Sequence, residues 1–207
     1  MIKISTSILS SNNRVDSIKK LNDTNCNYIH IDVMDNKFVP NYQFPIEEIN
    51  KLIPLSTKKI DIHLMVEDPL TYINKINNSN IEYITIHYEI NDNIDNILQT
   101  IKNKGYKVGL AIKPKTKIDE VKEYLNKIDM LLIMSVEPGY GGQSFIPNTI
   151  NKINELKQLN KDLTVEVDGG INDKTIKQIY DISDIAVVGS YIINQIDYNK
   201  AINNLKN

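Results

Sequence analysis

The residues best suited to chemistry in this sequence are a histidine and an aspartate two positions apart. His30 and Asp32 stand in a stretch, residues 28–33, in which polar or aromatic residues alternate with β-branched ones. Such alternation is typical of a strand, whose alternate side chains point to the same face. We therefore predict that the imidazole and the carboxylate lie side by side, where they could bind a metal, move a proton, or hydrogen-bond each other.

A second histidine–aspartate pair and a distant acid extend this set. Asp61 and His63 are again two positions apart in a strand-like stretch, and Asp168 precedes two glycines at the end of another. Imidazole and carboxylate ligands without a thiolate suit Zn, Mn, Fe or Co. Spacing alone leaves simpler explanations open, namely a histidine that caps a carbonyl and an aspartate that begins a turn. The candidate metal ligands are His30, Asp32, His63 and Asp168.

Two carboxylates beside a metal suit proton transfer next to a ketone. A divalent cation on the ketone oxygen stabilises the enediolate that forms when the neighbouring carbon loses a proton. One aspartate can remove that proton and a second can return one on the opposite face, which inverts the centre. Asp32 and Asp168 lie on predicted strands far apart in the sequence, which suits opposite faces of a substrate. Asp35, on the other strand face, is expected to structure a loop.

Glycine-rich turns follow three of the later predicted strands. They are residues 138–143 (PGYGGQ), Gly169-Gly170 and Gly189-Ser190. Glycine lets the backbone approach an anion closely, although glycine after a strand is most often just a tight turn. In (β/α) barrels the loops after the seventh and eighth strands are the usual phosphate seat, and the last two turns hold those places. Together these two turns favour a phosphate group as the ligand, whereas the lack of a P-loop or dinucleotide-binding fingerprint argues against a nucleotide.

The elements that must position these residues repeat a strand–helix rhythm. Hydrophobic periodicity predicts strands at 2–9, 28–34, 59–66, 83–87, 107–112, 129–136, 163–167 and 185–188, and helices at 14–22, 46–53, 69–76, 94–101, 118–125, 150–159 and 174–180. About eight such units predict an α/β protein with a (β/α)8 TIM-barrel fold. Active sites of such barrels lie at the carboxyl ends of the strands, where the residues named above fall together with His87. Residues 1–207 are expected to form a single domain.

Length and composition narrow the class of protein. The chain has 207 residues, of which 41% are hydrophobic and 24% charged, values typical of a soluble globular protein. A net charge of −2 provides no basic field for nucleic acid or anionic lipid. Cys26 is the single cysteine, and the first residues lack a long apolar stretch. We expect a cytoplasmic protein with no nucleic-acid or membrane partner.

Several motifs follow one another in an order that matches a known family. They are residues 5–10 (STSILS), 30–35 (HIDVMD), 38–41 (FVPN), 61–66 (DIHLMV), 87–89 (HYE), 134–145 (MSVEPGYGGQSF) and 166–171 (EVDGGI). Almost from end to end, the chain resembles the ribulose-phosphate 3-epimerase family. The resemblance implies a ribulose-phosphate-binding barrel that interconverts D-ribulose 5-phosphate and D-xylulose 5-phosphate in the pentose phosphate pathway of carbohydrate metabolism. It implies two-base proton transfer at C3 through a metal-stabilised enediolate.

The resemblance also implies roles for single residues. One divalent metal ion (Zn, Fe, Mn or Co) would bind to His30, Asp32, His63 and Asp168, and Asp32 and Asp168 would be the two catalytic acid/base groups. The implied substrate-binding residues are Ser7, His63, Gly139, Tyr140, Gly141, Gly142, Gly169, Gly170, Gly189 and Ser190. Met34, Met65 and Met134 match supporting methionines near the reacting carbons, although methionine is also a common filler of cores. We expect the protein to bind a small sugar phosphate and to form a homo-oligomer.

Two departures and three alternatives accompany this resemblance. Glu137 stands where Asn or Asp is expected, and residues 113–116 (KPKT) replace Asn-Pro-x-Thr, so both bear on substrate preference. D-allulose-6-phosphate 3-epimerase shares the same motifs. A non-catalytic sugar-phosphate-binding barrel would be expected to lose a ligand or an acid. A lyase or decarboxylase would place a lysine among the central acids, and none stands at the predicted strand ends around Asp32 and Asp168.

Overall fold

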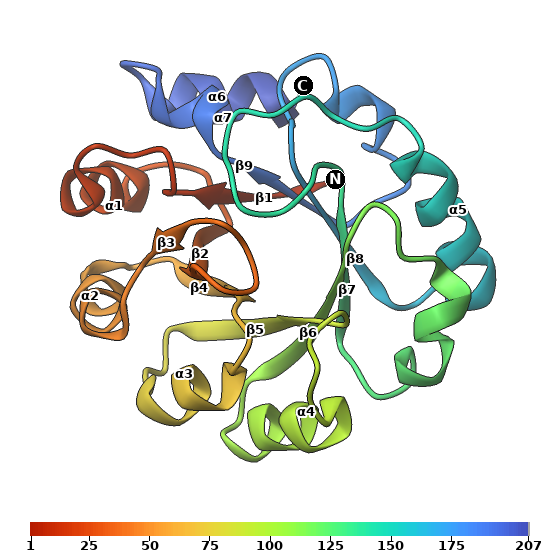
Figure 1. Cartoon of the computed structure of the whole chain (residues 1–207). Coiled ribbons are helices and arrows are strands. Elements are labelled where there is room, and N and C mark those ends of the chain that lie inside the picture. Colours follow the sequence, from red (N-terminus) through yellow and green to blue (C-terminus); the bar gives the residue numbers. More distant parts are fainter. Residues whose placement is uncertain (207) are drawn as a thin grey trace.

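Eight parallel strands form the wall of a closed barrel in the computed structural model, which describes residues 1–206 (Figure 1). They are β1 (Lys3–Ser7), β2 (Tyr28–Asp35), β4 (Lys59–Met65), β5 (Ile81–His87), β6 (Lys107–Ile112), β7 (Met130–Met134), β8 (Thr164–Asp168) and β9 (Ile185–Val188). Neighbouring strands pair in parallel, and β1 pairs with both β2 and β9, so the sheet closes on itself. The predicted (β/α)8 barrel is confirmed.

Helices cover the outside of the barrel and connect its strands (Figure 1). The α-helices are α1 (Arg14–Asn22), α2 (Ile46–Leu52), α3 (Pro69–Lys75), α4 (Ile94–Asn103), α5 (Thr149–Leu159), α6 (Ser190–Ile193) and α7 (Tyr198–Lys206), and the 3-10 helices are η1 (Ile53–Leu55), η2 (Ile118–Tyr124) and η3 (Ile176–Gln178). Apolar residues at helical spacing form the buried face of each longer helix, as Ile94, Ile97 and Ile101 do in α4. No helix within residues 1–206 is both long and apolar enough to cross a membrane.

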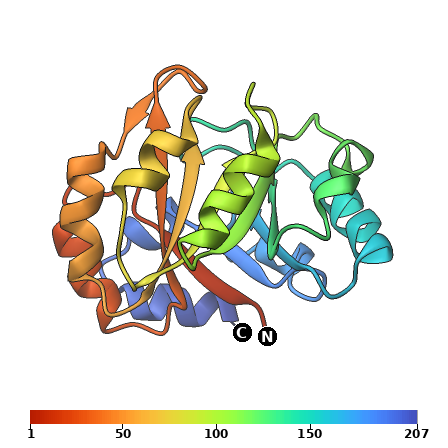
Figure 2. The same cartoon turned by 90° about the horizontal axis from the view of Figure 1, so that it is seen from below.

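Two of the predicted helices are 3-10 helices and not α-helices. Residues 118–124 of the predicted helix 118–125 form η2, and residues 174–180 contain only the three-residue η3. The buried Ile118 and Val121 are three positions apart, a spacing that both kinds of helix place on one face. The prediction also missed α7 and the short strand β3 (Tyr42–Gln43), which pairs antiparallel with β2. Figure 2 shows this hairpin above the barrel, at the end opposite the N-terminus.

Strand alternation decides what faces the interior of the barrel. Ile29, Ile31 and Val33 of β2 are fully buried in the main apolar core, which includes the buried faces of the helices. At the amino ends of the strands the residues Tyr28, Tyr83, Met130 and Ile185 pack into a separate cluster. This apolar layer fills the barrel from below, so the polar residues that follow on the same strand faces are directed toward the carboxyl ends.

Candidate active site

A cavity of about 690 Å³ opens at the carboxyl ends of the strands. Most of the predicted site residues line it, including both acids, Ser7 and the three glycine turns. The three methionines line it as well and are buried at the same time, Met34 and Met65 against Val39, and Met134 against Val136. His30 and His63 are fully buried beneath this lining.

The four predicted metal ligands come together at the base of this cavity. His30, Asp32, His63 and Asp168 each offer one ligand atom, and these atoms lie within 4.8 Å of one another. Strand register brings Asp32 of β2 opposite His63 of β4. Asp32 Oδ1 lies 3.2 Å from His30 Nε2 and 3.4 Å from His63 Nδ1, and Asp168 Oδ2 lies 3.8 Å from His63 Nδ1. β8 is not a neighbour of β2, so only barrel closure brings Asp168 to the other three.

Two unpartnered nitrogens test whether these residues fit a metal. His30 Nε2 and His63 Nδ1 are fully buried, face the aspartates and have no hydrogen-bond partner among the described residues. The opposite ring nitrogens are both occupied, since His30 Nδ1 lies 2.7 Å from Asp61 Oδ2 and His63 Nε2 lies 2.9 Å from His87 Nε2. A buried polar atom without a partner costs about 1–3 kcal/mol, which a bound cation would remove. The donor set therefore fits a divalent metal ion.

The electrostatics of the site separate the two aspartates. Burial, followed by the negative charge of Asp32, raises the pKa of Asp168 to about 7. Burial alone would also raise the pKa of Asp32, but the positive charge of His30 outweighs it and holds that pKa well below its usual range. Burial likewise opposes the charge on His30, yet Asp32 and Asp61 raise the pKa of this imidazole. The cluster thus attracts positive charge to the place where a cation would bind.

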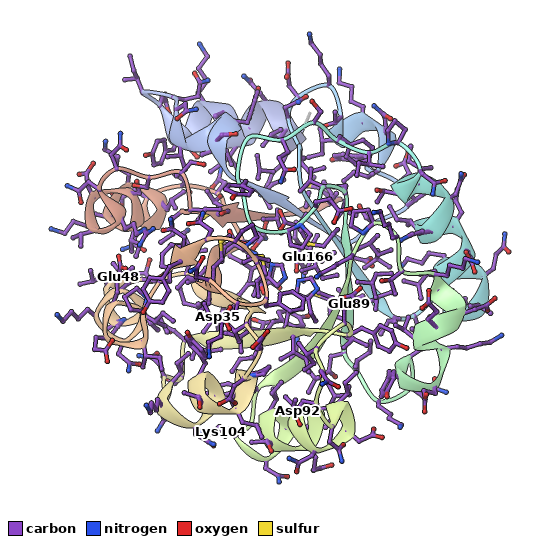
Figure 3. The ribbon with its side chains drawn as sticks, viewed as in Figure 1. Asp35, Glu48, Glu89, Asp92, Lys104 and Glu166 are labelled. Atoms are coloured by element: carbon purple, nitrogen blue, oxygen red, sulfur yellow. The ribbon has the colours of Figure 1, made fainter. Side chains whose placement is uncertain are left out.

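Further buried acids lie below the cluster, which sequence reasoning did not assign to the site. Asp61 Oδ2 accepts hydrogen bonds from Ser5 Oγ at 3.0 Å and from His30 Nδ1 at 2.7 Å. Glu166, near the middle of the view in Figure 3, has no hydrogen-bond partner for either carboxylate oxygen among the described residues. Burial, and then the charge of Asp61, raises the pKa of Glu166 well above its usual range. The spacing of Glu166 and Asp168 on one strand face was the signal available in the sequence.

Ser7 contacts Asp32 directly, whereas Asp35 holds the loops that follow β2 and β4. Ser7 Oγ donates a hydrogen bond of 2.6 Å to Asp32 Oδ2, so Ser7 contacts the predicted acid directly. Asp35, the last residue of β2, accepts hydrogen bonds from the backbone N–H groups of Lys37 and Phe38 at 2.9 Å and of Glu67 at 2.8 Å. Its predicted loop-structuring role is confirmed.

The glycine turns shape the mouth of the cavity. Gly169 and Gly170 have φ values of 121° and 65°, in the left-handed region that side chains rarely adopt. A Cβ atom would lie 2.5 Å from Val136 Cγ2 at the first position and 2.4 Å from the backbone nitrogen of Phe145 at the second. Both positions therefore require glycine for space as well as conformation. At Gly189 the nearest atom would lie at an ordinary 3.4 Å, so space does not demand glycine there.

Two loops from opposite sides of the barrel meet across the mouth. Asn41 Nδ2 donates to the Gly139 carbonyl at 3.2 Å, and the Tyr140 hydroxyl donates to the Pro40 carbonyl at 3.1 Å. Gly141 and Gly142 continue along the cavity lining. The side chain of Glu137, one of the departures from the family pattern, is exposed and is not part of this lining. Lys113, the other, places its ammonium 3.9 Å from the ring centroid of Phe38.

Comparisons with known proteins agree with these motifs. The model of a family described as "Ribulose-phosphate 3 epimerase family" matches residues 3–193. The ribulose-phosphate 3-epimerase of Bacillus subtilis (strain 168) is 34% identical over 214 residues, which cover 100% of this chain and 99% of that protein. The ribulose-phosphate 3-epimerase of Buchnera aphidicola subsp. Baizongia pistaciae (strain Bp) is 38% identical over 213 residues, with 98% and 93% covered.

The barrel is also similar to solved structures. A structure named KGPDC, from Streptococcus mutans, superposes with a TM-score of 0.71 at 14% sequence identity, covering 100% of this chain and 96% of that one. At this level of identity the similarity concerns the fold alone.

Proposed function

The chain belongs to the ribulose-phosphate 3-epimerase family and is an isomerase, and from this premise we propose that it interconverts D-ribulose 5-phosphate and D-xylulose 5-phosphate by proton transfer at C3. One observation carries the proposal. Asp32 and Asp168 reach the base of one cavity from non-neighbouring strands, beside two histidine nitrogens that have no hydrogen-bond partner within residues 1–206. This arrangement suits an enzyme that deprotonates one face of a carbon and reprotonates the other.

A divalent metal ion would be held by His30, Asp32, His63 and Asp168. When bound, such an ion polarises a ketone oxygen and stabilises the negative charge that develops when the neighbouring carbon loses its proton. The set of two nitrogens and two carboxylates admits Zn, Fe, Mn or Co. Asp61 supports the site from behind, because its carboxylate accepts a hydrogen bond from His30 Nδ1–H and leaves Nε2 directed at the other ligands.

The two proton transfers are assigned to Asp32 and Asp168. Ser7 Oγ fixes one oxygen of Asp32 at 2.6 Å, which orients the carboxylate toward the cavity that it lines. In the protein without metal, the pKa of Asp32 is lowered and that of Asp168 is raised to about 7. Two carboxyl groups whose pKa values are separated in this way can act as base and acid in the same turnover. Removal from one face and return to the other inverts C3.

The remaining lining is assigned to the rest of the sugar phosphate. Gly169, Gly170, Gly189 and Ser190 would receive the phosphate, because glycine lets the backbone approach an anion and these turns follow the last two barrel strands. Residues 139–142 would cover the substrate from the mouth of the cavity. Met34, Met65 and Met134 surround the reacting end with weakly polar surface, which reduces competition from water.

The alternatives predict different chemistry in the same cavity. Its described lining contains no lysine, the residue that a lyase or decarboxylase on such a barrel would be expected to use. Every predicted ligand and acid is present, which argues against a non-catalytic barrel. D-allulose-6-phosphate 3-epimerase activity would use the same residues and is distinguished by assay. A homo-oligomer and a cytoplasmic location stay predictions.

The decisive experiment compares two substrates with one preparation. Purified protein is analysed for metal content, reloaded with one divalent metal at a time, and assayed on D-ribulose 5-phosphate and D-allulose 6-phosphate. We expect the higher kcat/KM on the pentulose phosphate and loss of activity after chelation. A preference for the hexulose phosphate would replace the proposed substrate. Metal-loaded protein that epimerises neither compound would overturn the proposal.

A further inference from the structure

A chain of three buried polar side chains leads away from the candidate metal site. His63 Nε2 lies 2.9 Å from His87 Nε2, and His87 Nδ1 lies 3.0 Å from Glu89 Oε2. Both histidines are fully buried and stand on the neighbouring strands β4 and β5. Neither His87 nor Glu89 lines the cavity, so neither is placed to contact a substrate. His63 therefore contacts His87 through Nε2, while its other ring nitrogen, Nδ1, faces Asp32.

The hydrogen bonds of this chain can run in only one direction when both imidazoles are neutral. A neutral imidazole has one N–H donor and one lone-pair acceptor. Glu89 offers lone pairs to His87, so His87 Nδ1 carries the proton and its Nε2 is the acceptor. His63 Nε2 must then be the donor, which leaves the lone pair of His63 on Nδ1. This nitrogen lies 3.4 Å from Asp32 Oδ1 and has no hydrogen-bond partner in the described part of the chain.

The turn that follows β6 keeps Glu89 in its role as acceptor. Glu89 Oε1 accepts hydrogen bonds from the backbone N–H of Lys113 at 2.7 Å and from the Thr116 hydroxyl. The buried ammonium of Lys152 in turn donates to the carbonyls of Lys113 at 3.1 Å, Pro114 at 2.7 Å and Thr116. Both Glu89 oxygens are therefore committed as acceptors, one toward the turn and one toward His87.

We propose that His87 and Glu89 are positioning residues, which fix the tautomer of His63 that can bind a metal through Nδ1. The inference rests on the proposed metal site and extends it to residues outside the cavity. A carboxylate behind a metal-binding histidine sets the tautomer and orientation of the ring and increases its basicity. For His30 the carboxylate of Asp61 does this directly, whereas for His63 the effect of Glu89 passes through a second imidazole.

Substituting the carboxylate by an amide should reverse the whole chain. In Glu89→Gln the single amide oxygen remains with the N–H and hydroxyl groups of the 113–116 turn, so the amide NH₂ faces His87. His87 Nδ1 would then accept, its Nε2 would donate, and His63 would hold its proton on Nδ1. That tautomer has no lone pair for a metal at the site.

The tautomers are read by NMR in metal-free protein near neutral pH. The chain has three histidines, so two-bond ¹⁵N–¹H spectra contain few ring signals. We expect the wild type to carry the proton of His63 on Nε2 and that of His87 on Nδ1, and Glu89→Gln to show both reversed. A wild-type His63 protonated on Nδ1, or an unchanged spectrum in the variant, would overturn the proposal.

Metal affinity supplies the second readout, with Co²⁺ titrated against a competing chelator. Glu89→Gln and His87→Phe should bind Co²⁺ about 10- to 100-fold more weakly than the wild type. His87→Gln should restore affinity, since its amide oxygen can accept the proton of His63 Nε2. Glu82→Gln, at the other end of β5, is the matched control and should bind as the wild type does.

The outcomes separate this inference from the proposed function. Wild-type protein that binds no Co²⁺ overturns the metal site itself and the positioning role with it. If the wild type binds Co²⁺ and the folded Glu89→Gln variant binds it equally tightly, only the positioning role is overturned. Circular dichroism and thermal melting verify that each variant is folded before its affinity is interpreted.

Discussion

The two central aspartates lie in different electrostatic environments. Asp32 is held by Ser7 and lies beside the positive charge of His30, whereas Asp168 is influenced mainly by burial and by Asp32. Two like charges so close together favour one protonated and one ionised group. These different environments support an acid role for one aspartate and a base role for the other, although the two side chains are chemically identical.

Replacing either aspartate by asparagine should remove one proton transfer. In Asp32→Asn and Asp168→Asn we expect kcat to fall by about 10²- to 10⁴-fold, the usual contribution of a positioned acid or base. Exchange of the C3 proton with D₂O, followed by NMR, measures the step directly. The exposed Asp95→Asn on α4 serves as the control. Near-normal exchange in either central variant would remove that residue from the mechanism.

His87 should leave a measurable trace in the pH dependence of stability. Burial is the main cause that lowers its pKa from 6.5 to about 4. The unfolded chain then binds more protons than the folded one between these values, so His87 costs stability as pH falls. Relative to His87→Gln, metal-free wild type should lose roughly 2–3 kcal/mol between about pH 6.5 and 4.5. Urea unfolding at each pH measures this difference, and parallel curves would contradict the assigned environment.

At the scale of elements, strand ends and turns set the shape of the cavity. β8 delivers Asp168 and is followed at once by Gly169 and Gly170, which pass close to Val136 and Phe145 in the preceding loop. Glycine is needed because the side chain of Val136 occupies the space of a Cβ atom at Gly169 and the backbone of Phe145 occupies it at Gly170. The same two residues thus satisfy a packing constraint and leave their backbone open to the cavity.

Gly170→Ala should therefore affect both stability and substrate binding. Its matched control is Gly105→Ala, since Gly105 also has a positive φ of 83° but no atom of the residues that the structure describes lies within 4 Å of the added Cβ. The control measures backbone strain alone, and we expect Gly170→Ala to cost about 1–3 kcal/mol more, from overpacking. The KM for the sugar phosphate should rise only in Gly170→Ala. Equal unfolding free energies for the two variants would contradict this prediction, because they would show that the loop around Phe145 accommodates the added methyl group at no cost in stability.

At the scale of the whole molecule, closure of the barrel creates the site. An apolar cluster fills the amino end, and the polar residues of several strands converge above it. His30, Asp32, Asp61 and His63 come from the first half of the chain, whereas Glu166 and Asp168 come from the second. A ligand that contacts both halves stabilises the folded barrel as a unit.

Metal binding should consequently raise the melting temperature of the whole domain. At a free metal concentration 100 times the Kd, mass action adds about 2.7 kcal/mol to the free energy of unfolding. For a chain of this length, each kcal/mol raises Tm by roughly 2–4 °C. Calorimetry with and without metal measures the shift, which should be absent in Asp168→Asn. An equal shift in that variant would place the bound metal elsewhere.

The sequence by itself determined the strands, their inward faces and the identity of the candidate ligands. Alternation is a local property, so His30 and Asp32 could be placed on one strand face without any tertiary information. The motifs likewise determined the family. Local periodicity could not separate a 3-10 helix from an α-helix at residues 118–125, because apolar residues three apart fit both.

Only the tertiary structure decided which of these residues meet and which atoms they present. Asp32 and Asp168 share one cluster because β1 closes the barrel between β2 and β9, a contact that no local pattern encodes. His87 changes from an isolated strand-end histidine to the partner of His63 because β4 and β5 pair side by side in the sheet. The nitrogen that each imidazole turns toward the site depends on what hydrogen-bonds the other nitrogen, and those partners lie on neighbouring strands far apart in the sequence.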